Sequence, residues 1–220
     1  MGRQRPGADR RDGPANLPDT ERCSPTRALR RAETQRAMTI DSSVLSIKLH
    51  RMFTFLDTDQ DGSLTEQDLT AIADRLAGSV PTQPEKVQRL RDALAVIWDQ
   101  HLRHMDDDGN GLISSAEYER GVRGAITSQE SALISALHDV VAACLDICDR
   151  DDDGLITLDE YTLLGQAVSG GTTKDMATAF SALDLDGDGA LGPEEIRTAV
   201  TEYFTSEDAE ARGNWLYGPL

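Results

Sequence analysis

One twelve-residue pattern occurs four times in this chain and constrains its fold more than any other feature. Each copy begins with Asp, carries oxygen-bearing side chains at its third and fifth positions, has Gly at its sixth, and ends in an acid. The copies begin at Asp57, Asp106, Asp149 and Asp184. An acidic chain could contain one such segment by chance, but four copies require a common cause.

The residue types in the pattern are those that surround a hard divalent cation. Positions 1, 3 and 5 offer side-chain oxygens, position 7 a backbone carbonyl, and position 12 a carboxylate that binds through both oxygens when it is Glu. The predicted ligands are Asp57, Asp59, Asp61, Ser63 and Asp68 in the first copy, and Asp106, Asp108, Asn110, Leu112 and Glu117 in the second. In the third they are Asp149, Asp151, Asp153, Leu155 and Glu160, and in the fourth Asp184, Asp186, Asp188, Ala190 and Glu195. The sequence thus predicts up to four Ca²⁺ sites.

An apolar residue at the eighth position supports this interpretation over an alternative. Solvated acidic turns would also be rich in Asp and Gly. They would not explain an apolar residue at the eighth position of every copy, where Leu64, Ile113, Ile156 and Leu191 stand. An extended apolar residue there can pair with the equivalent strand of a second loop. We therefore expect the four loops to form two pairs.

The flanks of each loop have the periodicity of amphipathic helices. Apolar residues recur at fixed offsets before and after the loops, at Phe53, Leu102, Leu145 and Phe180 and again at Leu69, Tyr118, Tyr161 and Ile196. Three outgoing helices begin with a capping box, at Thr65, Ser114 and Thr157, and Pro193 suits the first turn of the fourth. Helix, loop and helix together resemble the EF-hand.

These features predict an all-α fold of eight helices between about residue 41 and residue 205, with short β bridges from loop to loop. We expect four regions: a disordered basic tail over 1–37, a first pair of helix–loop–helix units over 38–125, a second pair over 126–204, and a C-terminal tail over 205–220 that folds back on the core. Translation from Met38 would place the tail upstream of the start.

Charge is distributed unevenly along the chain. Residues 1–37 contain nine Arg and five acids, a balance of +4, so the formal charge of −17 leaves −21 on residues 38–220. Clustered carboxylates repel one another without metal, so we expect folding and metal binding to be coupled. Such an acidic surface argues against nucleic acid as a partner. We also expect no membrane insertion and a monomer, and a protein partner is possible but not indicated.

The spacing of the loops resembles that of one EF-hand group. Gaps of 49, 43 and 35 residues separate the four starts, unlike the near-equal, shorter gaps of calmodulin. This spacing and the ending from Gly213 to Leu220 resemble the sarcoplasmic calcium-binding proteins and the calerythrin-like proteins. The resemblance covers about residues 40–220. It implies that the two pairs pack into one compact globule.

Two loops depart from the pattern in ways that predict different affinities. The second loop is often degenerate in that family, whereas Asp106, Asp108 and Glu117 make this one look competent. Asn110 lowers its charge, so we expect it to bind more weakly than the third and fourth. The first loop ends in Asp68, one methylene shorter than Glu, which disfavours bidentate binding and favours tolerance of Mg²⁺.

Three functions remain open at this point. We expect a cytoplasmic calcium buffer or transport protein, because an adaptable sensor groove is typically rich in Met. Only Met52, Met105 and Met176 follow the Met38 start, and the first two face inward by periodicity. A calcium sensor that regulates a protein partner is the alternative. A photoprotein-like ligand binder is a minor one, and no catalytic residues are expected.

Cysteine usage fits a reducing compartment. Cys144 and Cys148 lie one helical turn apart, on positions where the other repeats have mostly apolar residues. The α-carbons at that spacing are at the far end of disulfide range. We expect reduced, buried thiols at both positions. The three cysteines of the chain show no disulfide framework.

Overall fold

The computed structural model describes residues 43–80, 83–128 and 131–220. Residues Asp41–Leu220 form one compact unit. The predicted tail over 1–37 and the proposed start at Met38 lie outside the described residues.

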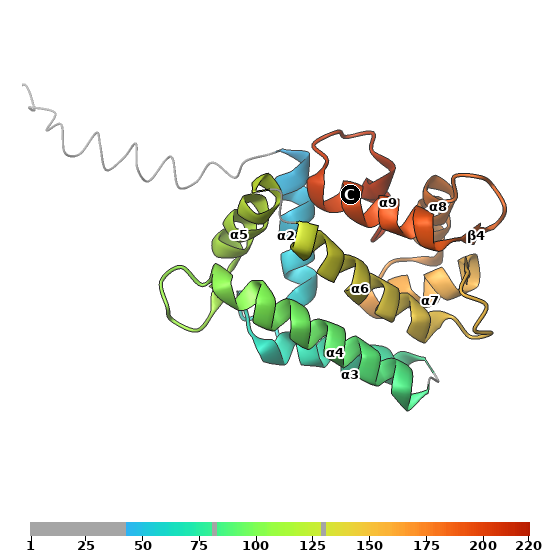
Figure 1. Ribbon diagram of the computed structural model, residues 1–220. Coiled ribbons are helices and arrows are strands. Elements are labelled where there is room, and N and C mark those ends of the chain that lie inside the picture. Colours follow the sequence, from blue (N-terminus) through green and yellow to red (C-terminus); the bar gives the residue numbers. More distant parts are fainter. Residues whose placement is uncertain (1–42, 81–82, 129–130) are drawn as a thin grey trace, which may run out of the picture. The chain divides into compact units, whose positions relative to one another are not determined.

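The described residues contain eight α-helices, which confirms the predicted all-α fold (Figure 1). The first two helix–loop–helix units are α2 (Val44–Leu56), β1 (Ser63–Leu64) and α3 (Glu66–Ser79), then α4 (Pro84–Gln100), the 3₁₀ helix η1 (Leu102–Met105), β2 (Ile113–Ser114) and α5 (Ser115–Thr127). The last two are α6 (Ser131–Cys148), β3 (Ile156–Thr157) and α7 (Leu158–Ser169), then α8 (Thr173–Leu183), β4 (Ala190–Leu191) and α9 (Pro193–Thr205). A second 3₁₀ helix, η2 (Arg212–Trp215), follows.

The outgoing helices begin where the capping residues predict. The N–H and hydroxyl of Thr65 donate to the Asp68 carboxylate at 2.9 and 2.7 Å. Equivalent pairs join Ser114 to Glu117 and Thr157 to Glu160. These bonds occupy donors that a helix start would otherwise leave unpaired. The last acid of each of these loops therefore also fixes the start of the helix that follows.

The incoming helix of the second unit is interrupted. Sequence periodicity predicts a helix up to the loop, but α4 ends at Gln100 and His101 adopts φ −131° and ψ −64°. A 3₁₀ turn then continues to Met105. Leu102 and Met105 remain buried. The tighter turn therefore keeps the predicted apolar contacts while changing the approach to the loop.

Each pair of loops is joined by a two-stranded antiparallel sheet, as the apolar eighth positions predict. Leu64 lies opposite Ile113 in the first pair, and Ile156 lies opposite Leu191 in the second. Because the two strands exchange backbone hydrogen bonds, the loops of a pair are held at a fixed distance. Loop one is thus paired with loop two, and loop three with loop four.

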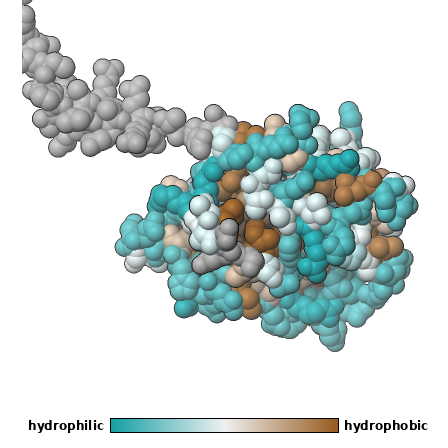
Figure 2. Space-filling view, turned by 45° about the horizontal axis from the view of Figure 1, so that its top comes forward, coloured by the Kyte–Doolittle hydropathy of each residue, from teal (hydrophilic) through white to brown (hydrophobic). Residues whose placement is uncertain are grey.

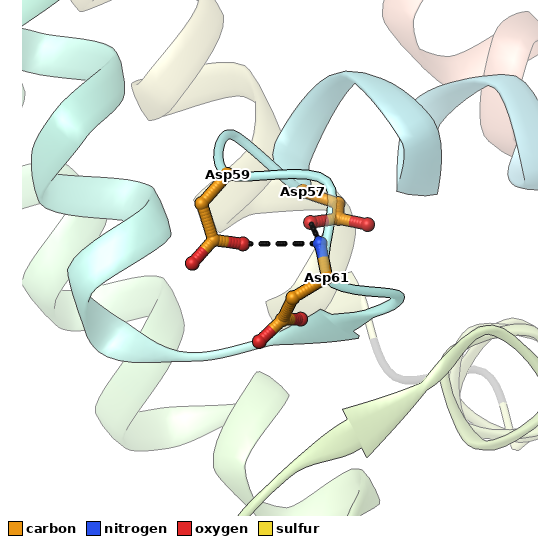
Figure 3. A group of neighbouring side chains, drawn as sticks. All are labelled: Asp57, Asp59 and Asp61. Atoms are coloured by element: carbon orange, nitrogen blue, oxygen red, sulfur yellow. Dashed lines mark hydrogen bonds between the residues drawn. The ribbon is translucent and has the colours of Figure 1, made fainter.

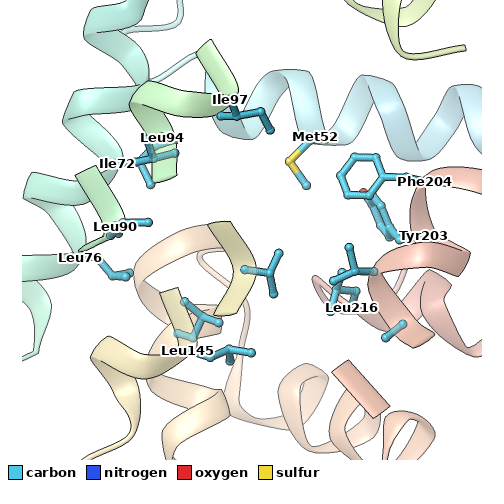
Figure 4. Close-up of a cluster of buried hydrophobic side chains, with 14 of the residues drawn as sticks. Met52, Ile72, Leu76, Leu90, Leu94, Ile97, Leu145, Tyr203, Phe204 and Leu216 are labelled. Carbon is cyan, nitrogen blue, oxygen red and sulfur yellow. The ribbon is translucent and has the colours of Figure 1, made fainter. Parts of the chain in front are cut away.

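Both pairs contribute to a shared hydrophobic core. Helix α4 packs along α6, α3 packs against α7, and α2 packs against α5 and α9. Figure 4 shows side chains from both pairs, including Met52, Leu90, Leu145 and Tyr203, directed toward one interior. One core of this kind explains why the four units form one globule rather than two lobes.

The segment after α9 lies against the helices. The Gly213 N–H donates to Oε2 of Glu202 at 2.8 Å, and a Cβ at Gly213 would meet the Ala199 carbonyl oxygen at 2.6 Å. Arg51 of α2 donates to the carbonyl of Gly218 at 3.1 Å and to that of Tyr217. Only Gly allows so close an approach of the backbone to α9.

Candidate metal centres

Each loop gathers three carboxylates around one point. The groups with ligand atoms within 4.8 Å of one another are Asp57, Asp59 and Asp61; Asp106, Asp108 and Glu117; Asp149, Asp151 and Glu160; and Asp184, Asp186 and Glu195. All twelve belong to the predicted ligand set. Three like charges so close together favour a cation between them.

Backbone N–H groups orient the first carboxylate of each loop. The sixth-position N–H of Gly62, Gly111, Gly154 and Gly189 donates to the first Asp of its loop at 2.8–3.1 Å. These four glycines have φ between +79° and +88°, which other residues adopt only with strain. In Figure 3 the N–H of Asp61 donates to both Asp57 and Asp59. The turn thus holds the side chains around the loop centre.

The twelfth residue joins the two ends of every loop. One of its carboxylate oxygens accepts from the N–H of position 2 and the other from the N–H of position 9, as for Glu160 with Arg150 and Thr157 at 2.9 Å each. The same two bonds hold Asp68, Glu117 and Glu195. A carboxylate with several donors keeps its charge, as a metal ligand must.

The pKa values of these acids follow from the same contacts. Burial acts to raise the pKa of Glu160, but the N–H groups of Arg150 and Thr157 more than offset it, so the pKa is lowered. Burial also acts to raise the pKa of Asp68. The hydrogen bonds from Thr65 and Thr58 outweigh burial, so the pKa of Asp68 is lowered. The bond from the Ser114 hydroxyl is the main cause that lowers the pKa of Glu117. These acids are therefore anionic at neutral pH.

The first loop differs from the others at its twelfth position. In the second, third and fourth loops the terminal Glu belongs to the close group of acids, whereas in the first loop Asp61 takes that place and Asp68 lies outside it. Asp68 is bonded at both ends like its counterparts, so the chain holds it in the same place. Its shorter side chain therefore leaves the carboxylate further from the loop centre.

The third loop contains a buried oxygen that fits a metal ligand. The Oδ1 atom of Asp149 is buried and has no hydrogen-bond partner among the described residues. Burying an anionic oxygen without a partner is costly. A bound cation would remove that cost, so the donor set and its surroundings fit Ca²⁺.

The remaining predicted ligands lie beside these groups. Asn110, Asp153 and Asp188 accept from the N–H of Leu112, Leu155 and Ala190 at 2.7–2.9 Å, so the fifth side chain folds toward the seventh residue of its loop. Ser63 and Ala190 begin strands, and Leu112 and Leu155 directly precede them. The carbonyls of these four residues stay predicted ligands.

Sequence reasoning missed one group that contacts the third loop. Lys86 of α4 is 5% exposed, and its ammonium donates to the carbonyls of Asp146 and Asp149 at 2.8 Å each. It also pairs with the carboxylate of Asp152. Nothing in the sequence pattern points from residue 86 to a loop some 60 residues later, because the contact depends on how the two pairs pack.

Comparison with known proteins agrees with this geometry. The family model described as "EF hand" matches residues 176–200. Obelin from Obelia longissima is 30% identical over 183 residues, which cover 78% of this chain and 89% of obelin. This chain is an EF-hand calcium-binding protein. Calerythrin from Saccharopolyspora erythraea is 27% identical over 176 residues, 78% of this chain and 99% of calerythrin.

A solved structure shares the fold over three quarters of the chain. A Streptomyces coelicolor calcium-binding protein, described in terms of prokaryotic calcium-mediated regulation, has a TM-score of 0.63 at 26% identity. The match covers 75% of this chain and 99% of that protein. Together with the calerythrin match, it confirms the resemblance to the sarcoplasmic calcium-binding protein and calerythrin-like family. This EF-hand chain therefore binds calcium ions.

No single described helix is long and apolar enough to cross a membrane, although one bent pair, Ser115–Thr127 with Ala132–Cys148, would be so by length and composition alone.

Proposed function

We propose that this EF-hand protein is an intracellular calcium buffer that binds four ions and folds further as it does so. The observation that carries the proposal is the grouping of acids within 4.8 Å in all four loops. Each such group loses repulsion when a cation binds, and binding to the folded form alone stabilises it. A site held at 100 times its dissociation constant gains about 2.7 kcal/mol.

Burial of the methionines favours a buffer over a sensor. Met52, Met105 and Met176 are each at most 7% exposed. A sensor groove exposes flexible apolar side chains when calcium binds. On the face in Figure 2, hydrophilic residues cover most of the surface and apolar residues appear as separate small areas. Among the large exposed apolar side chains, Ile47 lies on α2, Val96 on α4 and Leu185 in the fourth loop.

A calcium sensor is the second candidate, because the Streptomyces relative is described as regulatory. The two functions differ in the surface that calcium exposes. Calorimetric titration should give four ions per chain, with the apparent mass of a monomer in size-exclusion chromatography. Fluorescence of a dye that binds apolar surface should fall or stay constant on calcium addition. A large calcium-dependent rise in dye fluorescence would favour the sensor.

The interior cavity bears on the ligand-binding alternative. It is lined by apolar side chains that include Phe55, Cys144 and Tyr217, and its volume is about 70 Å³. Pockets for drug-sized ligands run to roughly 300–1,000 Å³. The cavity therefore supports a packed core rather than a chromophore site. Burial raises the pKa of the Cys144 thiol to about 12, which supports the reduced, unreactive thiol expected there.

The first site is the one we propose to tolerate Mg²⁺ most. Asp68 lies outside the close group of acids in its loop. A site without a bidentate twelfth ligand offers fewer oxygens, which suits the octahedral shell of Mg²⁺. Calcium titration in millimolar Mg²⁺ should weaken the first site more than the other three.

A further inference from the structure

The two EF-hand pairs are joined at a point where one helix of the first pair contacts a metal loop of the second. Lys86 lies in the first turn of α4, and the carbonyls of Asp146 and Asp149 accept from its ammonium at 2.8 Å each. Asp149 is also the first residue of the third loop. The same residue therefore presents a carboxylate to the proposed ion and a carbonyl to the other pair.

The ammonium occupies an acceptor that the loop leaves open. The N–H of Arg150, which a continuing helix would direct to the Asp146 carbonyl, donates instead to Glu160 at 2.9 Å. The Asp146 carbonyl would then lack a partner at the end of α6. A cation at a helix C-terminus is also favoured by the helix dipole. Lys86 supplies both the proton and the charge.

An acid outside the ligand positions strengthens the contact. Asp152 stands at the fourth position of the third loop with φ +59°, where the second and fourth loops have Gly. Its carboxylate pairs with Lys86 and accepts from the Gln83 side chain at 3.3 Å. An Asp in this left-handed conformation is less favourable than Gly. The pair with Lys86 is a local reason for Asp at this position.

Helix α4 connects this contact to another metal loop. It has 17 residues, about 25 Å at 1.5 Å per residue, and leads through η1 to Asp106 at the start of the second loop. We propose that Lys86 is a positioning residue through which the third site and the second site are energetically coupled along α4. Drawing Asp149, Asp151 and Asp153 around an ion moves the carbonyl and carboxylate that hold Lys86, and α4 carries that displacement through η1 to the second loop.

A binding cycle tests the coupling. E160Q disables the third site, and the amide signals of Gly111 and Gly154 report the second and third sites separately, because each N–H donates to the first Asp of its loop. In the otherwise natural chain, E160Q should weaken calcium binding at the second site about five-fold or more. In the K86M background the same change should alter it less than about two-fold.

Two further variants separate this role from general effects. R91Q removes a positive charge from the same helix, where Arg91 pairs with Asp74 at 2.6 Å inside the first pair, and should leave the coupling intact. D152G removes the acidic partner of Lys86 and relieves the left-handed backbone. It should reduce the coupling, and it provides the test if K86M does not fold.

The coupling through Lys86 rests on the proposed ligand sets, and the experiment shows separately whether the ligand set or the coupling fails. A Gly154 signal that ignores calcium in the natural chain would reject the third ligand set itself. The other outcome is a Gly154 signal that responds to calcium in the natural chain. If E160Q then leaves the calcium affinity of the second site unchanged, or changes it by the same factor in the K86M background, Lys86 has no coupling role and the inference is wrong.

Discussion

The first and third calcium loops share a ligand pattern but are held differently by the rest of the chain. The third has Glu160 within its close group of acids, a buried Asp149 oxygen without a hydrogen-bond partner among the described residues, and a lysine from the other pair on its backbone. In the first, the terminal acid is Asp68 and lies outside the group. Its carboxylates accept from N–H and hydroxyl groups of the same loop.

This difference shows that a ligand pattern determines where an ion binds but not how the site is linked to the protein. The third loop is built into the contact between the pairs, so its occupancy affects the whole globule. The first loop is joined to its neighbour by the short pairing of β1 with β2. We therefore expect the third site to be tighter and more selective, and the first to be weaker and more permissive.

The largest effect should follow from removing the terminal acid of each loop. Even a partner outside the metal's own ligands is worth 10–100-fold in affinity, so the loss of the ligand Glu160 in E160Q should weaken the third site by at least about 100-fold, or ~2.7 kcal/mol. D68N should weaken the first site by only about ten-fold, since Asp68 already lies outside the group. Calorimetry with the Gly62 and Gly154 amide signals would assign each loss. Equal losses would remove the proposed distinction between the two loops.

Restoring the missing methylene should make the first loop resemble the third. D68E would bring the carboxylate into the close group and allow bidentate binding, so calcium affinity at the first site should rise by about ten-fold, ~1.4 kcal/mol. Competition by millimolar Mg²⁺ at that site should decrease. E117D in the second loop is the reverse change and should increase Mg²⁺ competition there. An unchanged ratio of calcium to magnesium affinity in D68E would contradict the role given to Asp68.

Local patterns in the sequence predict most of the fold and little of the coupling. The strand pairs Leu64–Ile113 and Ile156–Leu191 follow from the apolar eighth positions, and the helix starts follow from their capping residues. These features depend on residues within one loop or its repeat. The contact of Lys86 depends instead on packing between distant helices, and no residue pattern marks the break at His101. No period or motif in a single sequence carries that information.

The second buried lysine should affect stability without affecting a metal site. Lys48 of α2 donates to the carbonyls of Glu202 and Ser206 at the end of α9, and burial is the main cause that lowers its pKa to about 8. Between about pH 8 and 10.5 the unfolded chain then binds more protons than the folded one, so the free energy of unfolding rises with pH.

This rise should disappear in K48M. The slope of the free energy of unfolding against pH should then be lower than in the natural chain by about 1 kcal/mol per pH unit near pH 8–9. Above pH 10 the buried Tyr161 and Tyr203, whose pKa values are raised by burial, act in the opposite direction in both proteins. K174M, at an exposed lysine, is the matched control. Urea unfolding in calcium at several pH values measures the difference, and calcium affinity at the first site should stay the same. A loss of that affinity would show that the first loop is linked to the globule through Lys48 after all.

The smallest effect concerns the residue that directly follows each loop. Tyr161 follows the third loop, and its hydroxyl donates to the carbonyl of Leu216 at 2.9 Å, which joins the third unit to the C-terminal segment. Leu69 follows the first loop and has no hydroxyl to make such a bond.

Y161F should lower the free energy of unfolding of the calcium-loaded protein by about 1 kcal/mol, the net value of one hydrogen bond. Y118F, the same change after the second loop, removes a hydroxyl from a side chain that is equally buried and should lower it less. A loss in Y118F as large as that in Y161F would mean that the hydroxyl matters for packing alone, and that the C-terminal segment gives the third unit no support that the others lack.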